Sequence, residues 1–356
     1  MKNEPAPYTK SDQYSDPSFP VDEALGWSEF NSNERVYKMN GSYSWTRIST
    51  LSGITLAGSD GKFSINDIAQ GYLGDCYFLS ALSSVAEKHE DVAGIFDQTE
   101  LNSEGMYSIW AWPKGKPTNI RLDDQILSSN ASTLRPVFTK VSEDKSVLVP
   151  LLEKYWAKLN GNYAQIEGGW STEGITQLMG SPGYWSNCNG CTAEQVYEKI
   201  NSLDRENNYI SVGSRSETCG QLGIVGGHAY SVHSAYKIKA TDGSTQCLIH
   251  IRNPWASERY TGDYGRASSL LTDDVLAQLR DQGAPEHSLD RDNDGDFFMK
   301  CEDWNTAWST LFVNSYNQGW YSTSVEGTDT AGSTQMELKF TNPKMQDVMV
   351  GGDVWH

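Results

Sequence analysis

The stretch Asp67–Leu79, DIAQGYLGDCYFL, joins a glycine-containing loop to the start of an apolar helical pattern. From Cys76 onward, apolar side chains recur at helical spacing at Phe78, Leu79, Leu82, Val85 and Ala86, so residues 76–87 are predicted to form a helix. A thiol in the first turn of a helix is favoured as thiolate by the helix dipole and the free N–H groups. Cys76 is therefore a candidate nucleophile. The alternative is a small buried cysteine, which is the commoner role of a lone cysteine.

Further elements follow on both sides of this stretch. Helical patterns cover Val149 to Leu159, which ends at Asn160-Gly161, and Thr192 to Ser202. Alternating patterns at His228 to Lys239 and Cys247 to Arg252 predict strands. The first half of the chain thus reads as helical and the second half as rich in β-structure, which indicates the α+β class. A late strand-like pattern covers Gln335 to Phe340.

Composition limits the class of protein and its partners. The 356 residues, 38% apolar and 21% charged, are typical of a globular chain long enough for two domains. A formal net charge of -18 disfavours binding to nucleic acid or to an anionic membrane surface. The sequence contains no signal-peptide pattern and no apolar run of about 18 residues that could span a bilayer. Six cysteines in a chain of this length do not make a disulfide scaffold, so we expect a reducing, cytoplasmic compartment.

Two residues of the second half complete a catalytic pattern with Cys76. His228 follows Gly226-Gly227 at the start of a predicted strand, and Asn253 ends another strand in the segment Arg252–Trp255. The order Cys, His, Asn is that of papain-like proteases, and the Cys–His spacing is close to the roughly 130–150 residues of that class. Taken alone, His228 is more often a hydrogen-bonded core histidine.

The motifs around these residues resemble the calpain family of cysteine proteases. Asp67–Leu79 is similar to the family's nucleophile motif, Gly227–Val232 to its histidine motif, and Ile251–Trp255 with Tyr260–Gly262 to its asparagine motif. Other matching stretches are Phe19-Pro20, Trp45–Arg47, Leu151–Lys154, Ala157–Leu159, Gly161 and Asp294–Met299. The resemblance covers about residues 15 to 320 and implies a two-lobed papain-like fold.

The resemblance also implies roles for residues beside the three catalytic candidates. Gln70 matches the family's oxyanion-hole glutamine, although without the motif an exposed loop residue is the better interpretation. Trp255 matches a tryptophan that shields the histidine–asparagine pair, and simple core packing is an equally good interpretation of it. Gly74, Gly227 and Trp255 are expected to support the substrate cleft.

Ca²⁺ is the cofactor that the resemblance implies, with one site in each half. Asp67 matches a ligand of the first site, which carbonyls near Ser59 and Lys62 would complete. The acidic ligand expected before Leu151 has no clear match: Ser146 stands near that place, with Glu143 and Asp144 just upstream.

At the second site Asp294 and Asp296 match the family, and Asp292 adds an oxygen. Arg259 stands where the family has an acid, Glu258 is displaced by one residue, and Arg266 stands at or near a later acidic position. Ca²⁺ takes 6–8 oxygen ligands, so these departures weaken the site. An arginine in the shell is an alternative source of positive charge.

Two local patterns have competing interpretations. Asp290–Gly295 fits the first half of an EF-hand loop, but position twelve is Cys301 and no clear helix precedes it, so a family metal loop or an acidic surface turn is preferred. Cys188–Cys191 is a single CxxC without a second pair at zinc spacing. We expect a free-thiol loop there, with zinc or redox chemistry as the lesser alternatives.

The sequence therefore predicts a calpain-type cysteine endopeptidase that acts on protein substrates. The alternative is a non-proteolytic, Ca²⁺-responsive binding module on the same scaffold. The predicted regions are a lead-in (1–44), a first lobe with the nucleophile helix (45–183), a β-rich second lobe (184–320), and a tail or the start of a β-sandwich module (321–356).

Overall fold

The computed structural model describes residues 13–30, 43–58, 60–88, 95–130, 132 and 134–315. Its α-helices are α1 (Val21–Ala24), α2 (Cys76–Lys88), α3 (Leu148–Asn160), α4 (Ser171–Met179), α5 (Ala193–Arg205), α6 (Asp273–Asp281) and α7 (Trp304–Ala307). Short 3₁₀ helices cover Trp27–Glu29, Ile48–Thr50, Ile65–Asp67, Pro113–Gly115, Ala164–Ile166, Cys219–Leu222, Glu286–Ser288 and Cys301–Asp303. The presence of both helices and antiparallel strands confirms the predicted α+β class.

The strands form one large sheet and two small ones, all antiparallel. The small sheets pair β1 (Ser44–Arg47) with β4 (Gln125–Ser128), and β2 (Met106–Ala111) with β3 (Thr118–Asp123). The large sheet has the order β5-β10-β6-β7-β8-β9. Its strands are β5 (Gly183–Ser186), β6 (Tyr209–Ser214), β7 (Ala229–Lys239), β8 (Thr245–Arg252), β9 (Asp296–Lys300) and β10 (Trp308–Asn314).

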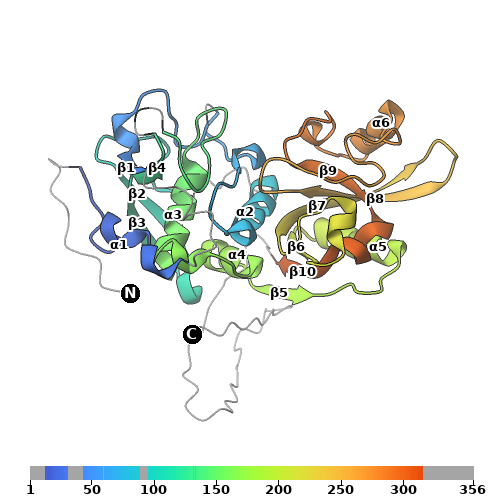
Figure 1. Cartoon of the computed structure of the whole chain (residues 1–356), viewed down its shortest axis with the longest axis horizontal. Coiled ribbons are helices and arrows are strands. Elements are labelled where there is room, and N and C mark those ends of the chain that lie inside the picture. Colours follow the sequence, from blue (N-terminus) through green and yellow to red (C-terminus); the bar gives the residue numbers. More distant parts are fainter. Residues whose placement is uncertain are drawn as a thin grey trace, which may run out of the picture.

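Helix α2 lies between the small sheets and the large sheet (Figure 1). It packs on β6 and β7, and Ser84 Oγ donates a hydrogen bond of 2.6 Å to the carbonyl of Ile210 in β6. On its other side it packs against α3, where the rings of Phe78 and Trp156 stack with centroids 5.1 Å apart. The nucleophile candidate therefore begins the helix at the centre of the molecule.

The large sheet is covered on both faces. Ile249 and Ile251 of β8 are buried in one cluster with Val196 and Ile200 of α5. Residues of the opposite face of β7 to β9 are buried with side chains of α6: Tyr236, Ile238, Leu248 and Phe298 with Val275 and Leu279. Two-sided burial explains why β7 and β8 are almost wholly apolar or buried rather than cleanly alternating.

Three predicted helices and two predicted strands are confirmed within three residues of their expected ends. Gly161, at a φ of 110°, ends α3 as predicted. Thr192 is the N-cap of α5, and with Gln195 it forms a reciprocal capping box. The prediction of a helical first half was incomplete, because it missed the strands β1 to β4. These strands are four to six residues long, and their burial does not alternate strictly, which removes the usual sequence signal.

Two predictions concern segments at the ends of the chain. Part of the expected lead-in is structured: α1 lies in it, and Phe19 is buried in the same core as α2 and α3. The expected strand at Gln335 to Phe340, and the tail 321–356 that contains it, lie outside the described residues.

Candidate active site

The loop before α2 is held by close backbone contacts. The carbonyl of Asp75 accepts hydrogen bonds from the amides of Phe78 (2.9 Å) and Leu79 (3.1 Å), which starts the helix at Cys76. A Cβ atom at Gly71 would stand 1.7 Å from the carbonyl oxygen of Phe138, so only glycine fits there. The loop is therefore fixed in place before the helix begins.

The Cys76 thiol meets the start of β7. The amide of Ala229, the residue after His228, donates a hydrogen bond to the Cys76 sulfur, and the amide of Tyr77 also faces it. Burial nevertheless raises the pKa of this thiol to about 11. The expectation that the helix start would lower this pKa is thus outweighed by burial, and the thiol is neutral in this arrangement.

His228 is positioned by its backbone and by one side-chain bond. Gly227 before it has a φ of 62°, in the left-handed region that glycine adopts readily. The amide of His228 donates to Ser214 Oγ at 2.9 Å, and the ring Nε2 lies 2.9 Å from Asn253 Oδ1. An amide oxygen accepts only, so Nε2 carries the proton in this contact.

Asn253 is itself fixed from two directions. Its amide donates to the carbonyl of Gly295 at 3.0 Å, and its Oδ1 also accepts from the amide of Trp255 at 3.1 Å. The Trp255 ring lies 4.7 Å from the His228 ring, and the guanidinium of Arg259 lies 5.8 Å from the Trp255 ring centroid. Trp255 therefore covers the His228–Asn253 pair.

Gln70 lies next to the segment that carries Asn253. Its amide donates to the carbonyl of Pro254 at 2.8 Å, which joins the nucleophile loop to the segment that carries Asn253. Its side-chain Nε2 donates to the carbonyl of Leu73 at 2.7 Å, and its buried Oε1 has no hydrogen-bond donor among the described residues. One N–H of the side-chain amide is thus used within the loop, and the second N–H is a possible donor to a ligand.

Gly74 lies on the exposed side of this loop. Its carbonyl accepts from the amide of Gly168 at 3.0 Å, and its own amide lies 3.4 Å from Glu167 Oε1. The loop therefore also contacts the glycine-rich segment that precedes α4.

The first group of acids surrounds Asp67. Asp67 Oδ2 accepts from the amide of Ser64 at 2.8 Å within a capping box of the 3₁₀ helix Ile65–Asp67. Burial raises the pKa of Asp67 to about 6, and the nearby charges of Asp144 and Asp60 act in the same direction. A cation would relieve this repulsion, and the donors are carboxylate oxygens of the kind that Ca²⁺ prefers. As arranged, however, the described acids here are not close enough together to form a metal site by themselves.

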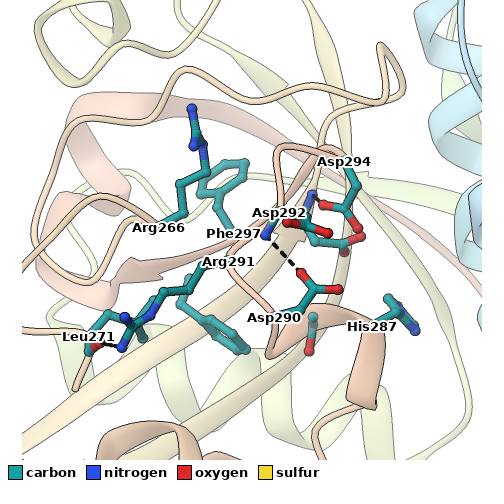
Figure 2. A pocket seen from close by; sticks show the side chains of 11 residues that line it. Arg266, Leu271, His287, Asp290, Arg291, Asp292, Asp294 and Phe297 are labelled. Atoms are coloured by element: carbon teal, nitrogen blue, oxygen red, sulfur yellow. Dashed lines mark hydrogen bonds between the residues drawn. The ribbon is translucent and has the colours of Figure 1, made fainter. Parts of the chain in front are cut away.

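The second group of acids lines a small pocket between β9 and the loop before it (Figure 2). Asp290, Asp292 and Asp294 lie on one side of it, with the Arg266 guanidinium turned away from them. Both carboxylate oxygens of Asp296 already have partners. One bonds His250 Nε2 at 2.6 Å, and the other pairs with Arg252.

The charges at this second group are only partly compensated, because burial and the charges of Asp296 and Asp290 raise the pKa of Asp294 to about 6 in spite of Arg252. Burial would raise the pKa of Asp296, but the Arg252 guanidinium and His250 hold it below its usual range. Arg252 also reaches Asp294 at 3.8 Å. Glu258 pairs with Arg266 at 2.9 Å, and so it does not face the acids of the pocket as a ligand. As arranged, Asp292, Asp294 and Asp296 do not fit a Ca²⁺ site. In the described part of the chain, no three acidic, histidine or cysteine side chains gather closely enough to hold a metal ion.

The comparison with protein families decides the identity of the fold. The model of the calpain family cysteine proteases matches residues 14–315. The chain belongs to the calpain family.

Calpain relatives in animals and plants match different shares of the chain. The calpain-2 catalytic subunit of chicken is 30% identical over 311 residues, which cover 84% of this chain and 42% of the chicken protein. The human calpain-2 catalytic subunit is 28% identical over 350 residues, 90% of this chain and 46% of its own length. The rice calpain-type cysteine protease ADL1 is 27% identical over 263 residues, 71% of this chain and 12% of its own length. The chain spans less than half the length of these relatives.

The cysteines of this calpain-family chain differ from the prediction. Cys188 and Cys191 form a disulfide, so the expected free-thiol loop is wrong. A second disulfide joins Cys247 of β8 to Cys301, which follows β9. The free-thiol prediction failed because the loop folds so that the Cα atoms of Cys188 and Cys191 lie 5.3 Å apart, which their spacing does not show. The Cys247–Cys301 pairing depends on the register of neighbouring strands, which the sequence does not show either. Cys76 and Cys219 remain free.

One feature of the site was not anticipated from the calpain motifs. The carboxyl group of Glu153, which was quoted only as part of a matching stretch, lies within hydrogen-bonding reach of Asp75, the residue before Cys76. The signal that could have found it is the presence of a charged residue on the otherwise apolar face of the 149–159 helix.

In the described residues, no helix is long and apolar enough to cross a membrane.

Proposed function

We propose that this chain is an endopeptidase that cleaves peptide bonds in protein substrates, with Cys76 as nucleophile, His228 as general base and acid, and Asn253 as its orienting partner. The contact that carries the proposal is the hydrogen bond from the Ala229 amide to the Cys76 sulfur. It brings the thiol to the backbone of the residue after His228, and the His228 ring bonds Asn253, which supports a pairing of Cys76 with His228. A nucleophile, a base and an orienting group in sequence are the requirement for cysteine catalysis.

The proposed reaction begins with proton transfer. Because His228 Nε2 bonds Asn253, we assign the exchange with the Cys76 sulfur to Nδ1. The thiolate attacks the carbonyl carbon, and the Cys76 amide and the second N–H of Gln70 stabilise the oxyanion. His228 then gives the proton to the leaving amine, and a thioester remains. Water, deprotonated by His228, adds to the thioester carbonyl, and the acid product leaves as Cys76 regains its proton.

Burial has a consequence for this mechanism. Since the pKa of the Cys76 thiol is raised to about 11, little thiolate exists before substrate arrives. The ion pair with His228 must therefore be favoured by substrate binding or by a small change in the site. Trp255, which covers His228 and is only half-buried, is the residue we assign to excluding water from that ion pair.

We further propose the two-lobed papain-like arrangement, with a substrate cleft where α2 meets β7. Gly74 and Gly227 are both exposed and flank Cys76 and His228 in sequence, which supports their placement along that cleft. The rival function, a non-proteolytic binding module, is disfavoured because Cys76, His228, Asn253 and Gln70 are all present. His228 bonds Asn253, while Cys76 and Gln70 contact the backbone of Ala229 and Pro254, the residues that follow His228 and Asn253.

Calcium activation is proposed for the first group of acids alone. Asp67, with Asp144 and Asp60 near it, would hold the ion, which would supply positive charge against their repulsion. At the second group the guanidinium of Arg252 supplies that charge. Activation would then need Ca²⁺ at the Asp67 group alone, and not at both groups of acids.

A cytoplasmic location also stands as a proposal. The two disulfides weigh against it, because disulfides persist mainly in oxidising compartments. Counting free thiols in protein taken from its native cells, with and without reductant, tests the proposal: full oxidation of both pairs in the cell would reject it.

The proposed peptidase function is tested by measuring cleavage of an unfolded protein substrate by the wild-type protein and by Cys76→Ala. Cys219→Ala serves as the matched control. Cys219 is the other free cysteine and is buried. We expect Cys76→Ala to lose all measurable cleavage and Cys219→Ala to keep it. Each assay is run with Ca²⁺ and with a chelator, and Asp67→Asn is expected to remove any Ca²⁺ response. Cleavage that survives Cys76→Ala would reject the function, whereas chelator-insensitive cleavage would reject only calcium activation.

A further inference from the structure

Two buried carboxyl groups meet beneath the start of α2. Asp75 precedes Cys76 and is 0% exposed, and Glu153 on α3 is 3% exposed. The two carboxyl groups lie within hydrogen-bonding reach of each other. Nothing in the proposed mechanism uses either group.

The donors available to the two carboxyl groups indicate that Asp75 and Glu153 hold a proton between them. Glu153 Oε2 accepts from the amide of Thr139 at 3.2 Å and from its Oγ1 at 3.0 Å. Both oxygens of Asp75 and the other oxygen of Glu153 have no donor from another residue of the described chain. Two ionised carboxylates cannot bond each other, since each offers only acceptors. One of the two therefore carries a proton and donates it to the other.

The charges around the pair favour keeping that proton. Glu167 faces Asp75 from the segment before α4, and the phenols of Tyr77 and Tyr163 lie near the pair from α2 and from the loop after α3. The nearest lysine in sequence, Lys154, is engaged with Asp123 and the carbonyl of Gln125. No lysine, arginine or histidine of the described residues forms a salt bridge with either carboxyl group.

We propose that Asp75 and Glu153 share one proton and act as a positioning pair that holds the nucleophile loop and limits the negative charge beside Cys76 to one unit. The mechanical part follows from the contacts of Glu153. Thr139, which it binds, forms a β-bridge with Gln70, so the pair connects α3 to both ends of the loop 70–75. Its consequence for catalysis rests on the proposed function of Cys76.

The electrostatic part follows from the place of Asp75. A negative charge there raises the pKa of the Cys76 thiol and opposes the thiolate at the start of α2. Burial raises the pKa of Asp75 to about 7, and burial with the neighbouring Asp75 charge raises that of Glu153 well above its ordinary value. The second negative charge thus appears only above neutral pH. Because the raised values belong to the folded state, stability is also highest with the proton bound and falls as pH rises through them.

The test is the pH profile of Cys76 alkylation by iodoacetamide, read at that residue by mass spectrometry. Glu153→Gln keeps the shape of the side chain and a permanent N–H donor toward Asp75, so the pair can no longer gain its second charge. We expect wild-type alkylation to rise less steeply over the pH range in which the pair loses its last proton, and more steeply again above that range. Glu153→Gln should continue to rise, to a rate roughly three- to tenfold above wild type near pH 9, the factor for a shift of about half to one pKa unit. Glu206→Gln, the same change at an exposed position on the surface, should match wild type.

Two further measurements separate this proposal from others. Glu153→Ala removes the donor and should lower the melting temperature, and Glu153→Gln should restore most of that loss. If Glu153→Gln fails to fold, the wild-type protein alone decides, through the infrared band of a protonated carboxyl group that disappears over the same pH range as the change in slope. A wild-type profile that rises without this change in slope, or one that Glu153→Gln reproduces, would overturn the shared proton. Alkylation needs no substrate, so a chain that shows the profile but cleaves nothing would reject the proposed function and leave the pair intact.

Discussion

The Cys76 thiol lies at the start of a helix, yet its pKa is raised rather than lowered. The helix dipole and the amides of Tyr77 and Ala229 favour the thiolate, but burial opposes it and is the larger effect. A sequence shows the position of a cysteine relative to a helix, and it does not show how deeply the thiol is buried. This is why the residue could be predicted and its protonation state could not.

Gln70 carries the residue-scale prediction. Gln70→Ala removes the side-chain donor proposed for the oxyanion, so kcat for a peptide substrate should fall by about 10²–10³. The substitution also removes the bond to the Leu73 carbonyl, which lies in the same loop. Alkylation of Cys76 by iodoacetamide forms no oxyanion, and its rate in Gln70→Ala should stay within about twofold of wild type. Equal losses in both assays would show that Gln70 only supports the loop.

The residues of the proposed triad were predictable and the carboxyl pair was not. Cys76, His228 and Asn253 each stand in a short motif whose residue types and order carry chemical meaning. The Asp75–Glu153 contact joins residues from two separate motifs, and it exists only because α3 packs against α2. Burial and packing decide it, and neither can be read from spacing.

Helices, at the scale of elements, were predicted better than strands. The pattern from Cys76 to Glu87 predicted a helix because apolar positions repeat over several turns and a loop precedes it. The small sheets β1–β4 and β2–β3 were missed, since four- to six-residue strands bury side chains on both faces. The strands β7 and β8 were found because alternating patterns, from His228 to Lys239 and from Cys247 to Arg252, cover most of their length.

Gly71 carries the element-scale prediction. Its backbone approaches that of Phe138 so closely that an added methyl group would collide with a carbonyl oxygen, and a main-chain atom cannot rotate away. Gly71→Ala should therefore destabilise the protein by about 1–3 kcal/mol and displace the loop that carries Gln70 and Cys76. Thermal unfolding measures the first effect and Cys76 alkylation the second. Gly220→Ala is the matched control, because a Cβ there meets no atom within 4 Å. Equal melting temperatures for the two variants would contradict the close approach.

For the whole molecule, the two halves of the sequence meet at α2. The amide of Gln70 bonds the carbonyl of Pro254, and the Cys76 thiol receives the amide of Ala229. Ser84 adds a third bond, from the middle of the helix to β6. The class and the order of motifs could be predicted from the sequence, while the Cys247–Cys301 disulfide and the partly compensated acids near Arg252 required the three-dimensional register of β8 and β9.

The central claim is that Cys76, paired with His228, is the nucleophile of a peptide-cleaving site. The most direct test is a peptide that carries a thiol-reactive electrophile in place of the scissile bond, with the labelled residue mapped by mass spectrometry. We predict one label, on Cys76, which an unmodified peptide substrate competes away and which His228→Ala slows by at least about 10²-fold. Labelling of Cys219 instead, or labelling of Cys76 at a rate that neither the competing peptide nor His228→Ala changes, would contradict the account.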